Sequence, residues 1–338
     1  MKNKLGIIYH NIQQHSMKKI SFYLFLSFGL LFLIACKKDN AQTVLTTTTP
    51  TPLTDFASGK YRGYQGGLYP NGSNQRPSAH NAAGVAIAQA IKPLNSLGSI
   101  DVTNGNIVWI SIGMSNTTMD TQAFLTSMLT FTNKNPKLIL IDGAESGQDI
   151  NKIIIATASY WADVNNRLTS SGLTPAQVQI IWVEEAEASP SDTSFATYPD
   201  ALEIKYKLLM QILKSKFPNL KLCYLSDRTY AGYATTKLNP EPFAWYTGWT
   251  VKRLIAEQIA GDASLNFTGA NPSSAWLSWG AYLWANGNIP RSDGLTWLPT
   301  DYQSDGTHPS ATGTQKTAQL LLQFFSSDET TKPWFLKP

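Results

Sequence analysis

The chain has 338 residues, of which 43% are hydrophobic and 15% charged, the composition of a globular protein with a sizeable core. Its 27 lysines and arginines exceed its 23 aspartates and glutamates only because four lysines lie in the first 35 residues, which contain no acid. The remaining residues carry equal numbers of basic and acidic side chains, which argues against nucleic acid as a partner. The two cysteines, Cys36 and Cys223, are too few for a disulfide scaffold or a cysteine-built metal site.

The first 35 residues have the layout of a signal peptide. An apolar stretch over residues 22–35 follows two lysines and ends on a small residue before Cys36, and Met17 is an alternative start. The stretch is shorter than the roughly 20 apolar residues of a membrane span, although an uncleaved anchor is the alternative. Residues 33–36, L-I-A-C, resemble the bacterial lipobox. The resemblance implies a lipid anchor on Cys36 and a place in the cell envelope, at the outer membrane, periplasmic or surface-exposed.

A threonine- and proline-rich segment follows the cysteine. Residues 36–55 contain few large apolar side chains, so they cannot bury enough surface to fold, and we expect an extended tether. No second segment of this composition interrupts the rest of the chain. We therefore expect one folded domain over residues 56–338.

Four short runs rich in isoleucine, valine and leucine predict the strands of a central sheet. They cover residues 107–112, 137–142, 178–183 and 220–225. Because the runs are continuously apolar, they are typical of strands buried on both faces in a parallel sheet. Segments with helical spacing lie at residues 119–131, 150–171, 200–216, 248–260 and 311–326. This succession predicts an α/β fold with helices on both faces of the sheet.

The candidate functional residues lie in the loops after these strands and before the last helix. In an open parallel sheet, ligands bind beyond the carboxyl ends of the strands. The side chains and turns that we expect at this edge are Ser115, Gly147, Glu187, Arg228, Asp305 and His308. A serine at a strand-to-helix turn, a glycine loop and an aspartate–histidine pair would thus come together.

At these positions the sequence resembles the SGNH or GDSL-like hydrolases, a family of serine esterases, lipases and acetyl-esterases. The most specific motif is D-G-T-H-P at residues 305–309, which is similar to the family block that carries the aspartate and histidine of the triad. I-G-M-S-N at residues 112–116 is similar to the nucleophile block, with Met114 in place of the usual acid. The resemblance covers residues 107–325 and implies a three-layer α/β/α, flavodoxin-like fold.

The resemblance also implies roles for individual residues. A serine hydroxyl becomes nucleophilic when a neutral imidazole accepts its proton, and that imidazole needs an acceptor on its other nitrogen. The implied nucleophile is Ser115, the base is His308 and the acceptor is Asp305. E-S-G-Q at residues 145–148 is similar to the block whose glycine lends a backbone N–H to the oxyanion hole, so this hole would use Gly147 and Ser115. No metal or cofactor is implied.

One block departs from the family pattern. Where the family has an asparagine after the third strand, this chain reads W-V-E-E-A-E-A, and Glu187 is the candidate for that position. An ionised carboxylate there would oppose a developing oxyanion. Alternatively, Glu187 pairs with an arginine such as Arg228 or Arg291.

The segment 270–304, just before Asp305, is dense in aromatic residues, among them Trp284 and Trp297. Such rings could line a sugar or acyl pocket, or they could pack a long insertion against itself. Glu187, Arg228, Trp284 and Trp297 are therefore the possible substrate-binding residues.

Together these patterns predict a serine esterase of the cell envelope that deacylates a carbohydrate or another small ester. The alternative is a glycan-binding surface lipoprotein that keeps the fold and has lost effective catalysis through the change at Glu187.

Overall fold

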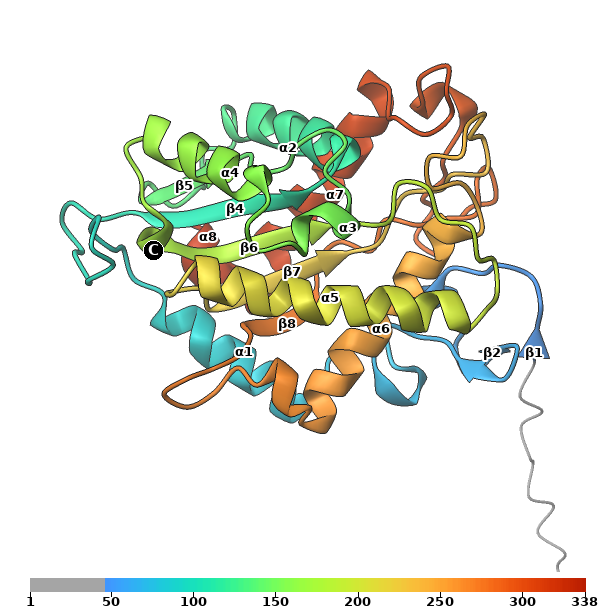
Figure 1. The fold of residues 1–338 in the computed structure, drawn as a ribbon, viewed down its shortest axis with the longest axis horizontal. Coiled ribbons are helices and arrows are strands. Elements are labelled where there is room, and N and C mark those ends of the chain that lie inside the picture. The colour runs from blue at the N-terminus through green and yellow to red at the C-terminus, as the bar shows by residue number, and fades with distance from the viewer. Residues whose placement is uncertain (1–45) are drawn as a thin grey trace, which may run out of the picture. The chain divides into compact units, whose positions relative to one another are not determined.

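The computed structural model describes residues 46–338, and their core is a parallel sheet of five strands (Figure 1). The strands are β4 (Ile107–Gly113), β5 (Leu138–Ile141), β6 (Val178–Glu184), β7 (Leu222–Ser226) and β8 (Trp276–Trp279). They lie in the order β5-β4-β6-β7-β8, with every neighbouring pair parallel. The chain thus starts inside the sheet, steps to one edge and returns past its start, which is the flavodoxin-like order.

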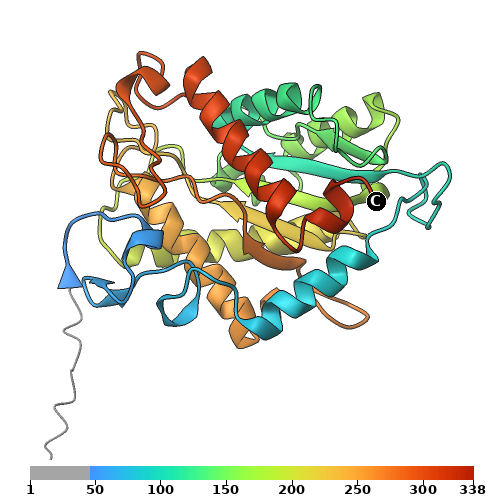
Figure 2. The same cartoon turned by 180° about the vertical axis from the view of Figure 1, so that it is seen from behind.

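Helices cover both faces of the sheet, so the predicted three-layer α/β/α fold is confirmed. On one face lie α4 (Ser159–Ser170), α5 (Thr197–Lys216) and α6 (Phe243–Ala260). On the other lie α1 (Ser78–Ala90), α2 (Ser115–Met128), α7 (Ala311–Ser327) and α8 (Lys332–Phe335). Figure 2 shows α7 crossing this second face beside α2.

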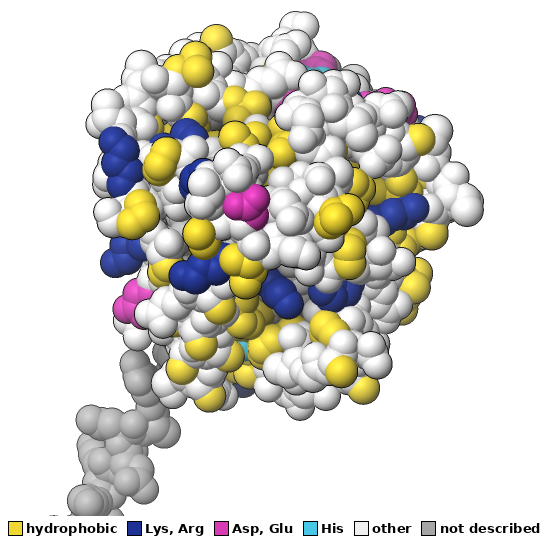
Figure 3. All heavy atoms as spheres, turned by 90° about the vertical axis from the view of Figure 1, so that its left-hand side faces the viewer, with side chains coloured by type: hydrophobic (Ala, Val, Ile, Leu, Met, Phe, Trp, Pro, Cys, Tyr) yellow, Lys and Arg dark blue, Asp and Glu magenta, His cyan; other side chains and the backbone are white. Residues whose placement is uncertain are grey.

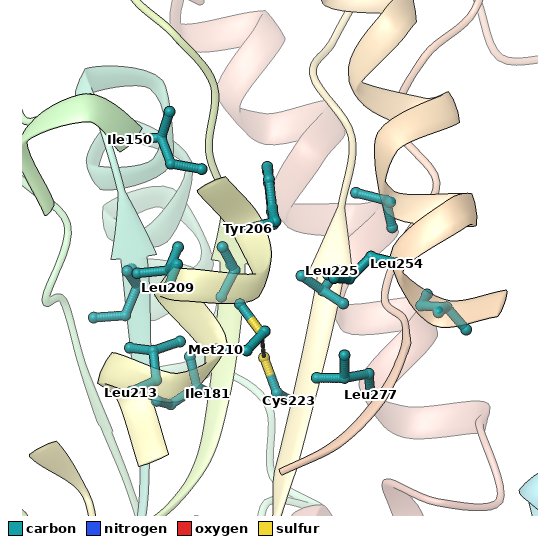
Figure 4. Packing of buried hydrophobic residues seen from close by; sticks show 14 of the residues in the cluster. Ile150, Ile181, Tyr206, Leu209, Met210, Leu213, Cys223, Leu225, Leu254 and Leu277 are labelled. Atoms are coloured by element: carbon teal, nitrogen blue, oxygen red, sulfur yellow. Dashed lines mark hydrogen bonds between the residues drawn. The ribbon is translucent and has the colours of Figure 1, made fainter. Parts of the chain in front are cut away.

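The alternation of side chains along each strand separates two apolar cores. In β4, Val108 and Ile110 face the core under α4, α5 and α6, whereas Ile107 and Trp109 face the core on the other side. Figure 4 shows the first core from close by, with Met210 of α5 against β7. All of these strand residues are buried, which explains why the strands appear in the sequence as unbroken apolar runs.

A cysteine of β7 lies at the centre of this first core. The sulfur of Cys223 is 3.8 Å from Sδ of Met210, and Leu225 and Leu277 pack around the same site (Figure 4). Burial raises the pKa of the Cys223 thiol well above its ordinary value.

The sequence analysis misses two elements that meet each other. Strand β8 has only four residues, Trp-Leu-Ser-Trp, and therefore lacks an isoleucine- and valine-rich run. Helix α1 is built largely from alanine and has little apolar contrast between its faces. The two pack closely, because a Cβ on Gly84 would come within 2.3 Å of the ring of Trp276.

The predicted helix over residues 150–171 is two helices. A short α3 (Ile150–Ile153) is followed by a turn and then by α4. Nε1 of Trp161 donates to the carbonyl oxygen of Ile153 at 3.1 Å and so holds the turn closed.

The second half of the predicted tether belongs to the folded body. Strand β1 (Thr46–Thr47) pairs with β2 (Lys60–Tyr61), which pairs with β3 (Tyr64–Gln65). Leu53 is buried, and its N–H donates to the hydroxyl of Tyr282 at 2.8 Å. The tether prediction is therefore wrong for residues 46–55, because one leucine and the local main chain find partners on the body. The predicted signal peptide, Cys36 and the rest of the tether lie outside the described residues.

Figure 3 views the molecule from the end at which the strands begin. Lysine and arginine side chains are scattered over this face among apolar and uncharged ones. Two lysines that precede strands donate to the main chain: Nζ of Lys134, before β5, donates to the carbonyl oxygen of Leu138 at 2.7 Å, and Nζ of Lys214, before β7, to that of Leu220 at 3.0 Å. Between residues 46 and 338, no helix is both long and apolar enough to cross a bilayer.

Candidate active site

The candidate nucleophile stands at the junction of β4 and α2. Ser115 is the first residue of α2, two positions after β4 ends at Gly113. A Cβ on Gly113 would lie 2.2 Å from both the carbonyl oxygen of Glu184 and Oγ1 of Thr117, so only glycine allows the first turn of α2 to approach β6 this closely. The tight junction presents Ser115, partly exposed, at the carboxyl edge of the sheet.

The structure brings Ser115, His308 and Asp305 together. Nε2 of His308 is 2.8 Å from Oγ of Ser115, although the two residues are 193 positions apart in the chain. Nδ1 of His308 is 2.5 Å from Oδ2 of Asp305. The hydroxyl therefore faces one imidazole nitrogen and the carboxylate faces the other, which is the arrangement that nucleophilic catalysis by serine requires.

Hydrogen bonds hold the Asp305 carboxylate in place. Its Oδ1 accepts the backbone N–H groups of Thr307 and His308, each at 3.0 Å. Partial burial acts to raise the pKa of Asp305, but the hydrogen bonds from the His308 ring and from these two N–H groups outweigh it, so the pKa lies below its ordinary value. Asp305 is thus ionised at neutral pH and can accept the proton on Nδ1 of His308.

A glycine shapes the loop between the aspartate and the histidine. Gly306 has φ +68°, and a Cβ there would lie 1.9 Å from the carbonyl oxygen of Tyr233. The same neighbouring loop donates the N–H of Thr235 to the carbonyl oxygen of Asp305 at 2.9 Å. The glycine in D-G-T-H-P is therefore required both by its backbone conformation and by the closeness of the loop at residues 233–235.

The predicted oxyanion hole consists of backbone N–H groups. The N–H of Ser115 belongs to the first turn of α2, where helical N–H groups have no partner within the helix. Gly147 lies on an exposed turn with φ +75°, and its carbonyl oxygen accepts a hydrogen bond from Lys152. Within residues 46–338 no hydrogen bond engages the N–H of either Ser115 or Gly147. Both are free to donate, and their role in an oxyanion hole stays a prediction.

Two residues next to the nucleophile, which the sequence analysis did not single out, tie the site together. Nδ2 of Asn116 donates to the carbonyl oxygen of Thr307 at 3.0 Å, and so links the Ser115 turn to the loop of His308. Oγ1 of Thr117 donates to the carbonyl oxygen of Glu184 at 2.6 Å. Both Asn116 and Thr117 are buried. The only sequence signal for them is a run of short polar side chains directly after a candidate nucleophile.

A buried ion pair lies under this turn. Nη1 of Arg228 is 3.0 Å from Oε1 of Glu184, and the two side chains are 5% and 0% exposed. Arg228 is therefore inaccessible to substrate, and the prediction that it binds substrate is wrong. Its partner is Glu184 rather than Glu187, because Glu184 ends β6 beside the end of β7.

Asp120 adds an acid to the same buried region. Neither of its oxygens has a hydrogen-bond partner among residues 46–338, and the side chain is buried. Burial first, and then the nearby Glu184, raise the pKa of Asp120 well above its ordinary value, whereas Arg228 lowers it by less. Burial also raises the pKa of Glu184. Asp120 therefore holds its proton more tightly than a solvent-exposed aspartate does.

The other predicted substrate-binding residues are engaged elsewhere. Glu187 forms an ion pair with Lys205 of α5, whose Nζ also donates to Asn151 at 2.6 Å. Trp284 and Trp297 are buried, and their Nε1 atoms donate to other protein groups at 2.8 Å. Their burial favours the alternative that the aromatic residues pack the insertion against itself over the alternative that they line a pocket. Within the part of the chain that the structure describes, no group of three or more His, Cys, Asp or Glu side chains could hold a metal ion.

Comparisons with known proteins give distant likenesses only. No family model matches the chain, and no curated protein matches its sequence. A GDSL-like lipase from Bacteroides thetaiotaomicron is 11% identical with a TM-score of 0.37, over 72% of this chain and 95% of that one. A proposed acylhydrolase from Bacteroides fragilis is 13% identical with a TM-score of 0.37, over 74% and 96%. A protein from Arabidopsis thaliana is 12% identical with a TM-score of 0.33, over 62% and 67%.

Proposed function

We propose that the protein is a serine hydrolase that cleaves carboxylic esters. The observation that carries the proposal is the continuous series of contacts from Oγ of Ser115 through the imidazole of His308 to Oδ2 of Asp305. Three chemically different groups from two distant segments meet in the order that the reaction needs. A serine with only a structural role in a turn would not require a histidine that is itself oriented by a carboxylate.

The chemistry follows from these positions. Nε2 of His308 accepts the proton of the Ser115 hydroxyl while Oγ bonds to the carbonyl carbon of the ester. The resulting oxyanion would be stabilised by the free N–H groups of Ser115 and Gly147 and by the positive end of α2. Collapse of the tetrahedral intermediate breaks the bond to the alcohol, which takes the proton from Nε2. Water then attacks the acyl group on Ser115 and loses its proton to His308. Collapse of this second intermediate releases the acid, and Oγ of Ser115 takes the proton back from Nε2.

The proposal extends to substrate and location as the sequence predicts them. The substrate is a carbohydrate ester or another small ester, and the protein acts in the cell envelope on a lipid anchor at Cys36. The alternative of a glycan-binding protein without catalysis depended on a carboxylate of Glu187 beside the oxyanion. Because Glu187 pairs with Lys205 of α5, the argument that its carboxylate impairs catalysis no longer supports this alternative.

A fluorophosphonate probe tests the proposal directly, because it bonds only to an activated serine. We expect labelling of the wild-type protein on Ser115, no labelling of Ser115→Ala, and hydrolysis of p-nitrophenyl acetate by the wild type but not by Ser115→Ala. The matched control is Ser170→Ala at an exposed serine of α4, which should be labelled and should hydrolyse the ester as the wild type does. Equal labelling of the wild type and Ser115→Ala would refute the assignment.

A further inference from the structure

A groove of about 590 Å³ lies between α2 and the start of α7, with Met119, one helical turn after Ser115, and Pro309, the neighbour of His308, in its lining. The α2 side also contains Gln122, Ala123 and Thr126, and the other side is formed by Gln303, Pro309, Ser310 and the first turn of α7. We call it the α2–α7 groove. Its volume falls within the range of pockets that hold small organic ligands.

The groove runs down the same face of α2 that carries the nucleophile. Its α2 residues follow Ser115 by 4, 7, 8 and 11 positions, which is the spacing of one helical face. On the opposite wall, the N–H of Gln303 donates to the carbonyl oxygen of His308 at 2.8 Å. The groove therefore opens on the His308 side of the nucleophile. A leaving alcohol must take its proton from Nε2 of His308, so the alcohol part of the ester lies on that side.

The lining mixes polar and apolar residues and contains no charged side chain. Its hydroxyl groups donate to main-chain carbonyl oxygens. Oγ1 of Thr126 donates to the carbonyl oxygen of Gln122 at 2.8 Å, Oγ of Ser310 to that of Thr300 at 2.8 Å, and Oγ1 of Thr314 to that of Ala311 at 3.1 Å. These oxygens can still accept hydrogen bonds from a ligand. The groove consequently presents acceptors to a ligand.

The two glutamines add to this surplus of acceptors. Nε2 of Gln303 donates to the carbonyl oxygen of Pro309 at 3.2 Å, and Nε2 of Gln122 to Asp142 at 3.4 Å. Between residues 46 and 338, no hydrogen bond reaches Oε1 of either glutamine. A molecule rich in hydroxyl groups could donate to these oxygens.

We infer that the α2–α7 groove binds the alcohol part of the ester and that this alcohol is a neutral sugar. The apolar side chains of Met119 and Ala123 offer a surface for the C–H face of a sugar ring, and the surrounding acceptors bind its hydroxyl groups. The inference rests on the proposed function, because it takes Ser115 as the attacking group.

Two acetyl esters with different alcohols test it. Ala123 follows Ser115 by two helical turns, roughly 12 Å, which the ring of p-nitrophenyl acetate does not reach but a monoacetylated cellotriose does. We expect Ala123→Phe, which fills the groove, to raise KM for the monoacetylated cellotriose at least tenfold and to leave kcat/KM for p-nitrophenyl acetate within about twofold. Ala83→Phe, at a partly exposed alanine of α1, is the matched control and should change neither.

A binding measurement separates failure of this inference from failure of the proposed function. Ser115→Ala should bind monoacetylated cellotriose in a calorimetric titration, and Ser115→Ala with Ala123→Phe should bind it at least tenfold more weakly. If the wild type cleaves p-nitrophenyl acetate but Ser115→Ala does not bind the sugar ester, the groove assignment is overturned and the proposed function stands. An equal effect of Ala123→Phe on both esters would also overturn it. If no ester is cleaved, the proposed function fails. Sugar binding that is unaffected by Ala123→Phe would refute the assignment of the groove, whatever the activity.

Discussion

Nδ2 of Asn116 donates a hydrogen bond of 3.0 Å to the carbonyl oxygen of Thr307, the residue before His308. This contact joins the turn that carries the nucleophile to the loop that carries the base. Each of the two segments is also anchored separately, Thr117 to Glu184 and Asp305 to Thr235. The separation of Ser115 and His308 therefore depends on how these two anchored pieces are held together.

Removing this contact should weaken catalysis more than stability. We expect Asn116→Ala to lower kcat for p-nitrophenyl acetate by about 10²-fold, because a misplacement of about 1 Å between reacting groups costs that much. KM should change little, since Asn116 is buried and does not face the substrate. Steady-state kinetics check the prediction, with Asn165→Ala on α4 as the control. A kcat within threefold of the wild type would show that the Thr307 contact is dispensable.

Replacing Glu187 should cost stability and bring no gain in rate. Glu187 pairs with Lys205, and the two side chains are 16% and 27% exposed. Partly exposed ion pairs contribute roughly 0.2–1 kcal/mol, so Glu187→Asn should lower the free energy of unfolding by about that amount. Chemical denaturation of Glu187→Asn, Lys205→Met and the double variant measures the coupling. A tenfold rise in kcat would instead place the carboxylate at the oxyanion.

The buried acid Asp120 predicts how stability changes with pH. Its raised pKa means that the folded protein holds this proton more tightly than the unfolded chain does. The resulting stabilisation is complete below the unfolded pKa of about 4 and is lost as the pH rises toward the folded pKa. Asp120→Asn cannot lose a proton, so its melting temperature relative to the wild type should climb as the pH rises above about 4.

The matched control for this experiment is Asp163→Asn on α4, far from the buried ion pair in the chain. Its melting temperature should follow that of the wild type across the same pH range. If the curves of Asp120→Asn and the wild type also run parallel, Asp120 titrates as it would in water and its neighbours do not hold its proton.

The proposed lipid anchor makes its own prediction, although Cys36 lies outside the described residues. Cys36→Ala should abolish incorporation of labelled fatty acid and release the protein from membrane fractions. Cys223→Ala is the control, because this buried thiol of β7 should carry no lipid. Labelling that persists in Cys36→Ala would refute the anchor.

The sequence predicted the parts of the site that come from local motifs. Ser115, Asp305 and His308 follow from a glycine-bounded turn and a five-residue block, and the strands that position them are unbroken apolar runs. Buried polar networks give no such signal. Nothing in W-V-E-E-A-E-A shows that Glu184 faces an arginine in the loop after the next strand whereas Glu187 turns toward α5, because both are acids near the end of one strand.

For a related reason, aromatic content alone left two interpretations of residues 270–304 open. Trp284 and Trp297 are compatible with an open pocket or with a packed insertion, and only the three-dimensional neighbours distinguish the two cases. The α2–α7 groove escaped notice because its lining is small and polar. Its residues become adjacent only when α7 packs beside α2.

The thiol of Cys223 has a practical consequence. It is the only cysteine in residues 46–338, it lies in β7 between β6 and the edge strand β8, and its sulfur is packed against Met210. A maleimide can reach it only when β7 separates from α5, and its raised pKa further suppresses the reactive thiolate. In a Cys36→Ala background, the rate of maleimide labelling therefore reports how often the core between β7 and α5 opens, without any engineered label.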